Sequence, residues 1–317
     1  IACFIRDTVG ALGMHRAAPV QYIRPEIIGL ILGAYVLSMI RGEHQSKGGS
    51  SPIIRFILGF FVMIGALIFL GCPLRMILRL GGGDLNALFG IAGFAGGIGF
   101  GTIFLKRGYS LERTYALSKL ESAMMPAIQV GLLVLVVTAP AFIFFSQKGP
   151  GAMHAPWLIS LAAGLVVGGL SQFSRLCTVG GFRDLFLFKK SILIFGYLAV
   201  LIGVFVVNIS FGNFHLGFEN QPIAHTDGLW NFLGMALAGF CSVLLGGCPL
   251  RQLIMTGEGN SDSAVTVLGL AAGAAFAHNF GLAATGAGPT LNGEIAVGVG
   301  FVVALIIAIL NTKRVNA

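Results

Sequence analysis

Three of the five cysteines stand in sequence settings that could support sulfur chemistry. Cys72 and Cys248 each lie within the segment Gly-Cys-Pro-Leu-Arg, and Cys177 is followed by Thr-Val-Gly-Gly. Proline lacks a backbone N–H and disfavours helix in the residue before it, so a helix must break at Cys72 and at Cys248. Proline is also favoured at the first position of a new helix. Each of these two thiols is therefore predicted to lie at a helix N-terminus.

A helix N-terminus is a natural binding place for an anion. Its first N–H groups are unpaired and carry a partial positive charge, and a thiol beside them can donate to, or attack, a bound sulfur or selenium compound. Arg75 and Arg251 follow one turn later and add positive charge. An arginine inside a membrane is costly unless it is paired or faces water, so we expect a cavity nearby. The substrate-binding candidates are Cys72, Cys177, Cys248, Arg75 and Arg251, with Pro73 and Pro249 in a second tier.

The segment around Cys177 follows the same pattern. An apolar run ends there, the glycines follow, and Arg183-Asp184 opens the next segment. Asp184 is expected to neutralise an arginine, with Arg175 and Arg183 as the candidates. We place Arg183 and Asp184 in the second tier of site residues.

Other chemically competent side chains have simpler interpretations. Cys241 has no motif, so packing as a small apolar residue is favoured. His278-Asn279 lies within an apolar run, where an ionisable residue is a functional candidate; a neutral histidine bonded to a carbonyl explains it equally well, and both residues stay in the second tier. Four residues of the loop 212–228 could recruit a metal ion, but such a loop is more often simply solvated. These are His215, Glu219, His225 and Asp227, and we predict no metal site and no cofactor.

The composition is that of a membrane protein. Of 317 residues, 56% are apolar and 10% are charged, against roughly 25% charged in soluble domains. Glycine, with 47 residues, has about twice its usual frequency, and small residues let membrane helices approach closely. The net charge of +8 lies in short loops between apolar runs. It therefore indicates a partner that is a lipid bilayer and not a nucleic acid.

Nine apolar runs are long enough, or nearly so, to cross a hydrocarbon core of about 30 Å. They cover 27–40, 53–70, 87–105, 123–146, 156–174, 191–211, 230–247, 263–282 and 294–310. The predicted fold is an all-α membrane protein. Re-entrant or broken short helices are expected at the three cysteines, over 72–80, 177–185 and 248–256.

Loop charges indicate the orientation. The loops 41–55 and 106–121 are basic, as is the C-terminus with Lys313 and Arg314. The positive-inside rule places them in the cytoplasm. The loops 147–155 and 212–228 carry a single lysine between them and are expected outside.

An internal repeat divides the chain. Gly-Cys-Pro-Leu-Arg recurs after 176 residues, and at this offset Gly81, Gly83, Gly93 and Gly97 match Gly257, Gly259, Gly269 and Gly273. The helix leading into the motif starts at a basic loop in the first copy and at an acidic loop in the second. We therefore predict one membrane domain of two inverted repeats, 1–150 and 151–317. In such folds, substrate sites lie near the midplane, where broken helices of the two halves meet.

The repeat also predicts what precedes Ile1. Arg6-Asp7 aligns with Arg183-Asp184, so the partner of Cys177 would fall just before Ile1. We expect a further helix and a cysteine there, which would give five helices in each half. Cys3 is close to this position but out of register, and it is included among the substrate-binding candidates.

These motifs resemble those of the YeeE/YedE family of sulfur-compound transporters. The likeness extends along the whole chain and is most specific at Cys177 with Phe182-Arg183-Asp184, and at Gly247-Cys248 with the glycine-bounded helix after it. The segments 3–7 and 22–26 and both Gly-Cys-Pro-Leu-Arg copies are similar to the YedE branch, which is associated with selenium metabolism.

The resemblance implies a mechanism. In the thiosulfate-importing branch, short helices point into the middle of an inverted-repeat fold, and central cysteines pass the anion along by S–H hydrogen bonds. Cys72, Cys177 and Cys248 would form that relay here. Pro-Leu-Arg after the cysteine departs from the small or polar residues typical of thiosulfate relatives, and the added arginine could select a different oxyanion.

We expect a transporter, not an enzyme, that imports a selenium- or sulfur-containing anion such as selenite or thiosulfate across the inner (cytoplasmic) membrane. A membrane-embedded thiol redox or sulfurtransferase enzyme is the alternative; it needs two thiols with Cα atoms about 4.4–6.8 Å apart. A soft-metal channel would need thiolates that converge on one ion. No phosphate-binding Gly-x-x-x-x-Gly-Lys-Ser motif is present, so ATP-driven pumping by this chain is not expected. Facilitated diffusion, ion coupling, and trapping by a cytoplasmic chalcogen-accepting protein stay open.

Overall fold

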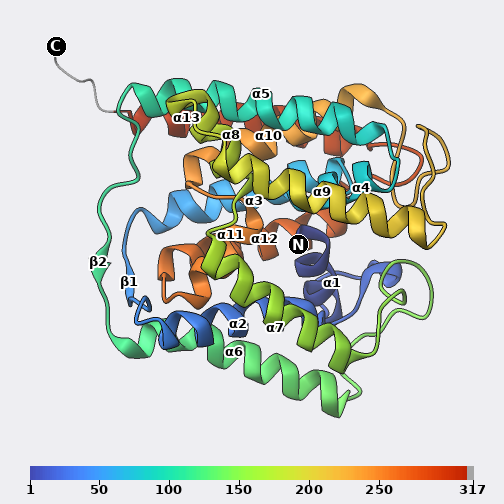
Figure 1. Ribbon diagram of the computed structural model, residues 1–317, viewed down its shortest axis with the longest axis horizontal. Coiled ribbons are helices and arrows are strands. Elements are labelled where there is room, and N and C mark those ends of the chain that lie inside the picture. The colour runs from blue at the N-terminus through green and yellow to red at the C-terminus, as the bar shows by residue number, and fades with distance from the viewer. Residues whose placement is uncertain (313–317) are drawn as a thin grey trace.

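The computed structural model describes residues 1–312 as a bundle of α-helices (Figure 1). The long helices are α2 (Pro25–Ile40), α3 (Pro52–Ile68), α5 (Asn86–Lys106), α6 (Lys119–Thr138), α7 (Trp157–Ser174), α9 (Ile192–Ser210), α10 (Gly228–Leu245), α12 (Ser261–Asn279) and α13 (Leu291–Leu310). The short helices are α1 (Ala2–Ala11), α4 (Pro73–Gly81), α8 (Thr178–Phe188) and α11 (Pro249–Gly257), with a 3-10 turn at Ala18–Val20. Two short strands, β1 (Lys47–Gly48) and β2 (Tyr115–Ala116), pair antiparallel beside the bundle.

The prediction of an all-α membrane protein is confirmed. Within residues 1–312, eight segments are long and apolar enough to cross a membrane. The predicted run 263–282 forms α12, a helix of 19 residues, but this helix is not among the eight segments. The predicted run 123–146 is too long, because α6 ends at Thr138 and Pro140 disfavours helix in the residue before it. Lys313 and Arg314 lie outside the described residues.

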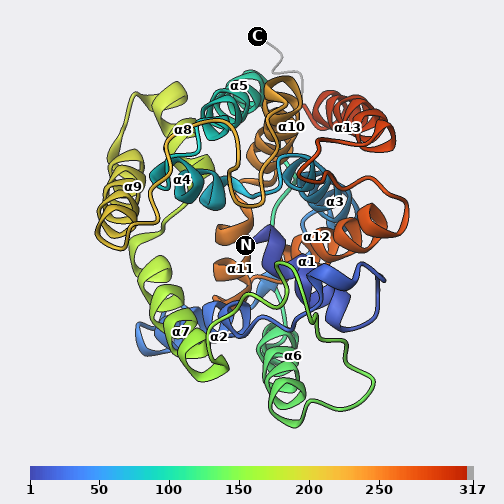
Figure 2. The ribbon, with the colours of Figure 1, turned by 90° about the vertical axis from the view of Figure 1, so that its right-hand side faces the viewer.

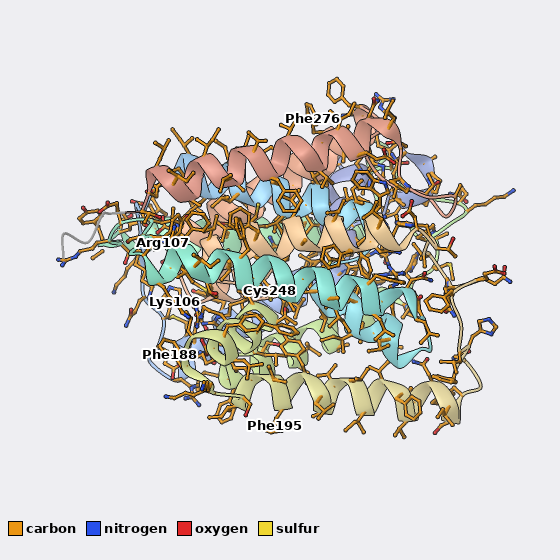
Figure 3. All side chains as sticks on the ribbon, turned by 90° about the horizontal axis from the view of Figure 1, so that it is seen from above. Lys106, Arg107, Phe188, Phe195, Cys248 and Phe276 are labelled. Atoms are coloured by element: carbon orange, nitrogen blue, oxygen red, sulfur yellow. The ribbon has the colours of Figure 1, made fainter. Side chains whose placement is uncertain are left out.

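The three predicted broken helices are present, and the start of each is buried inside the bundle, although the second half of α8 reaches the surface. Each of α4, α8 and α11 begins directly after a cysteine, as the sequence predicts. Viewed along the bundle, α1 and α11 lie near the centre, surrounded by the long helices (Figure 2). Cys248 is inside, whereas Phe195 and Phe276 lie at opposite outer edges (Figure 3). Such an apolar outer surface suits contact with lipid.

Glycines at equivalent places in the two halves bring the long helices into contact. A Cβ atom on Gly93 or Gly97 of α5 would overlap a carbonyl oxygen of α10. A Cβ atom on Gly269 or Gly273 of α12 would overlap a carbonyl oxygen of α3. The glycines that match at the offset of 176 therefore have the same role in both halves: they let two helix backbones approach closely.

The turns after the short helices repeat as well. The N–H of His215 donates to the carbonyl of Gly82, as that of Gln45 donates to the carbonyl of Glu258. The next bonds also correspond, from Gly217 to Gly83 and from Lys47 to Gly259. A loop of the second half thus holds the turn after α4, and a loop of the first half holds the turn after α11. The division at about residue 150 and the inverted relation of the halves stay predictions that these matched contacts support.

The glycine contacts generate a test with a neighbouring control. Gly97→Ala should destabilise the protein by about 1–3 kcal/mol, the range for overpacking a close interface, because its Cβ would overlap the carbonyl oxygen of Ala236. At Gly96, the nearest atom to an added Cβ is 3.9 Å away. Thermal unfolding of the purified protein in detergent should show a lower midpoint for Gly97→Ala than for Gly96→Ala. Equal midpoints would contradict the assigned contact.

Candidate functional site

Cys72 lies where two short helices begin. It is the residue before α4, with an extended backbone, and only 1% of its surface is exposed. The backbone N–H groups of Arg75, within α4, and of Ala2, at the start of α1, lie near its sulfur, although the Cys72 side chain makes no capping hydrogen bond to α4. The backbone nitrogen of Ile1 also lies 3.1 Å from this Sγ. The sulfur therefore faces the positive ends of two helix dipoles.

Cys248 has the same surroundings in the second half. It precedes α11 and is 1% exposed, and the backbone N–H groups of Arg251 and of Thr178, the first residue of α8, lie near its sulfur without a capping hydrogen bond to α11. Arg251 and Thr178 lie 176 residues after Arg75 and Ala2, so the groups around Cys248 correspond in the repeat to those around Cys72. Helix starts α1 and α4 meet at one thiol, and α8 and α11 meet at the other.

Cys177 stands beside Cys248. It precedes α8, its Sγ accepts from the N–H of Gly180 at 3.3 Å, and its side chain is hydrogen-bonded to that of Cys248. All five cysteines are free thiols. The structure therefore brings two of the three predicted thiols together, each at the N-terminus of a short helix.

Tyr197 is a buried tyrosine in the region of the two thiol sites, and the sequence analysis missed it. It is the only buried residue of α9, and its hydroxyl is close enough to interact electrostatically with Cys248, Cys177 and Cys72. With Thr178 and apolar side chains of α4, α5, α8 and α9, it lines a cavity of about 170 Å³. The sequence did offer a signal for Tyr197, because it is a polar aromatic residue within an otherwise apolar run.

The two arginines of the repeated motif have different surroundings. Arg75 borders a polar cavity of about 440 Å³, as expected for an arginine at this depth. Arg251 is instead paired with Glu258, through contacts of 3.1 and 3.0 Å. Glu258 also accepts from Arg175 at 2.8 Å. The second arginine is thus neutralised within the protein.

The expected partners of Asp184 are half correct. Asp184 pairs with Arg183 at 2.8 Å, as predicted. Arg175 does not pair with it and lies between Glu43 and Glu258, at 2.7 and 2.8 Å. The reason is that Arg175 ends α7 in a left-handed conformation, so its side chain reaches the turns after α2 and α11.

Glu43 links this cluster to the loop after α2. Its carboxylate accepts from Arg41 and Gln172, and these hydrogen bonds together with the charge of Arg175 lower its pKa. A lowered pKa keeps the carboxylate ionised near neutral pH. The ion pairs among Arg41, Glu43, Arg175, Glu258 and Arg251 therefore form one continuous network on this side of the bundle.

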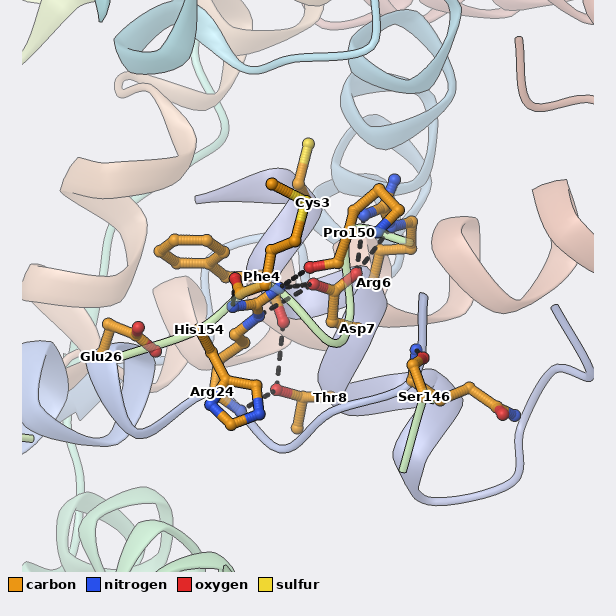
Figure 4. A network of polar contacts seen from close by, with 12 residues as sticks. Cys3, Phe4, Arg6, Asp7, Thr8, Arg24, Glu26, Ser146, Pro150 and His154 are labelled. Carbon is orange, nitrogen blue, oxygen red and sulfur yellow. Dashed lines mark hydrogen bonds and ion pairs between the residues drawn. The ribbon is translucent and has the colours of Figure 1, made fainter. Parts of the chain in front are cut away.

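A buried ion triad holds α1 against the segment that precedes α2 (Figure 4). Asp7 accepts from Arg6 at 2.7 Å and from Arg24 at 2.6 Å, and all three side chains are at least 95% buried. Arg24 also donates to the carbonyl of Pro150 at 2.8 Å and lies over the ring of Phe4. Cys3, on the same helix, donates to the carbonyl of Leu70 at 3.9 Å. The thiol of Cys3 therefore lies next to the break that precedes Cys72.

The remaining second-tier residues lie elsewhere. The rings of His278 and His15 lie against each other at a tilt of 31°, with 4.6 Å between their centres, and Asn279 donates to the carbonyl of Met14. These contacts hold the end of α12 against the loop after α1. Among residues 1–312, no three His, Cys, Asp or Glu side chains lie close enough together to hold a metal ion.

Comparison with known proteins supports the resemblance found in the sequence. A family model described as "Sulphur transport" matches residues 173–312, which include Cys177, Cys248 and the helices α8 and α11. This match confirms the YeeE/YedE family for that part of the chain, while the selenium branch stays a prediction. No curated protein matches the chain.

The ion triad predicts a large difference between two equivalent substitutions. Asp7→Asn would leave two buried arginines without their carboxylate and should cost about 3–5 kcal/mol of stability. Asp184→Asn removes a pair whose side chains are 32% and 25% exposed, and should cost about 0–1 kcal/mol. The unfolding midpoint in detergent should fall much further for Asp7→Asn, and a comparable fall in both variants would contradict the role of the triad.

Proposed function

Residues 173–312 belong to the sulphur transport family, and we propose that the protein carries a small sulfur- or selenium-containing anion across the cytoplasmic membrane along a path lined by Cys72, Cys177 and Cys248. One observation carries this proposal. At each of two buried thiols, the N-termini of two short helices converge on the sulfur.

This geometry suits an anion more than any other small solute. The N–H groups at the start of a helix carry a partial positive charge and bind anions in water-poor surroundings. Two such ends at one point supply more donors than one helix can. A thiol among them adds an S–H donor that can turn toward a ligand. An anion in the membrane interior loses its hydration, and these donors offset part of that cost.

The three thiols and Tyr197 provide successive contacts. Cys72 lies at one helix junction, Cys177 and Cys248 at the other, and the Tyr197 hydroxyl is near all three. An anion passing from one junction to the other would exchange hydrogen bonds over short steps and would form no covalent bond. Transport needs sites that are favourable enough to enter and weak enough to leave, and soft S–H donors meet both conditions.

A thiol redox or sulfurtransferase enzyme is the second candidate, because Cys177 and Cys248 are hydrogen-bonded neighbours. The two functions differ in what they need from Cys177. An exchange between thiols needs its sulfur, whereas a relay needs a donor. Cys177→Ser should therefore weaken transport but keep part of it, and it should abolish covalent exchange.

The transport proposal is tested by uptake of radiolabelled thiosulfate and selenite into cells that lack their own importers. Cys72→Ala and Cys248→Ala should each lower the initial rate at least tenfold, because each removes the donor at a helix junction. Cys241→Ala is the matched control: Cys241 is equally buried but lies in the middle of α10, away from any helix start. Its uptake should stay near that of the unaltered protein.

The outcomes separate the candidates. Thiosulfate uptake without selenite uptake would assign sulfur as the substrate, and the reverse would assign selenium. Normal rates in Cys72→Ala and Cys248→Ala, with all variants present in the membrane at equal amounts, would exclude the thiol relay. A complete loss in Cys177→Ser would favour the enzyme if the unaltered protein also transfers sulfur: its thiolate attacks the outer sulfur of thiosulfate, the bond to the sulfonate breaks, and a persulfide on the protein and free sulfite are both detected.

A further inference from the structure

We propose that the polar cavity beside Arg75 is the first binding subsite for the transported anion, and that the unpaired charge of Arg75 selects a divalent thio-oxyanion or oxyanion. This inference rests on the proposed function and specifies where the substrate is first held. Arg75 lies one turn inside α4, so an anion held by its guanidinium would be on the same short helix as Cys72.

Most of the residues that line the cavity are polar or charged, and backbone hydrogen bonds hold its walls. It has a volume of about 440 Å³ and lies between α4, the end of α9 and the loop that follows α9. Asn208, Asn213, His215 and Gln221 contribute polar side chains. The loop is tied to the turn after α4 by hydrogen bonds from His215 to Gly82 and from Gly217 to Gly83.

The charged side chains that line the cavity leave one positive charge without a partner, that of Arg75. Arg79 and Asp84 also line it, but they form a buried pair at 2.6 Å and neutralise each other. Arg75 has no carboxylate partner within residues 1–312. Its Nε atom is buried and has no hydrogen-bond partner. An arginine charge without a carboxylate partner is costly inside the protein, and an anion in the cavity would supply the missing countercharge.

The second half of the molecule shows what the first half lacks. Glu258 caps the C-terminus of α11 and holds Arg251 through both carboxylate oxygens. Gly82 caps the C-terminus of α4 at the equivalent position, 176 residues earlier. The same arginine is therefore neutralised in one half and free in the other, because the carboxylate that pairs with Arg251 has no counterpart at Gly82, and the carboxylate of Asp84 pairs with Arg79. The asymmetry gives one side of the protein an anion-binding arginine.

The structure allows the missing carboxylate to be installed. Gly82 has φ of −86°, which any residue can adopt. The nearest atom to an added Cβ is 3.4 Å away, an ordinary contact distance. Gly82→Glu should pair with Arg75 as Glu258 pairs with Arg251. Gly82→Gln has the same size without the charge and is the matched control.

Two measurements test the subsite. The first is equilibrium binding of ³⁵S-thiosulfate to the purified full chain, with sulfate as a competitor, and the second is the KM of thiosulfate uptake. Gly82→Glu and Arg75→Gln should each raise the Kd and the KM at least tenfold, and Gly82→Gln should change them less than threefold. Cys72→Ala should retain binding while it loses transport.

Each outcome decides between the two proposals. Equal Kd values in Gly82→Glu and Gly82→Gln would overturn the subsite. Transport by the unaltered protein with the same KM in Gly82→Glu would also overturn it, and would leave the transport function standing. Binding without transport would support the subsite and reject the transport function. Neither binding nor transport of thiosulfate would overturn the subsite, and selenite uptake would then decide the transport function alone.

Discussion

A helix that breaks inside a membrane leaves backbone N–H groups without partners, and the interior of this protein is organised around that constraint. Water is scarce there, so each free N–H group must find an acceptor within the protein or a ligand. The four short helices solve the problem in pairs. The starts of α1 and α4 share the sulfur of Cys72, and those of α8 and α11 share that of Cys248. Sulfur is a weak acceptor, so these N–H groups keep capacity for a stronger one, such as an anion.

The surrounding bundle keeps these helix starts in register. α5 packs on α10, and α12 packs on α3, at glycines where a side chain would overlap the facing backbone. The turns after α4 and α11 are each held by a loop from the other half. Packing and backbone contacts therefore repeat closely, whereas charge does not. Where Glu258 neutralises Arg251, Gly82 leaves Arg75 free. A duplicated scaffold can thus present different electrostatics to its two sides.

Local sequence chemistry predicted the parts of the structure that depend on neighbours in the chain. Proline after Cys72 and Cys248 placed the breaks correctly, and Arg183 pairs with the adjacent Asp184. The errors concern contacts between distant segments. Arg175 pairs with Glu43 and Glu258, which lie 132 and 83 residues away.

Helix α1 and Tyr197 were missed for related reasons. α1 has ten residues and no proline at its start, so no local signal separated it from a loop. Tyr197 lies in a run that is apolar on all sides, and periodicity therefore did not indicate which face is buried. The ion pairs between distant segments also differ in strength. Arg175 and Glu43 are 47% and 29% exposed, and exposed pairs contribute only about 0–1 kcal/mol each. The triad at Asp7 joins residues of α1 and the start of α2 and is at least 95% buried, so the loss of its carboxylate would leave two buried charges unpaired.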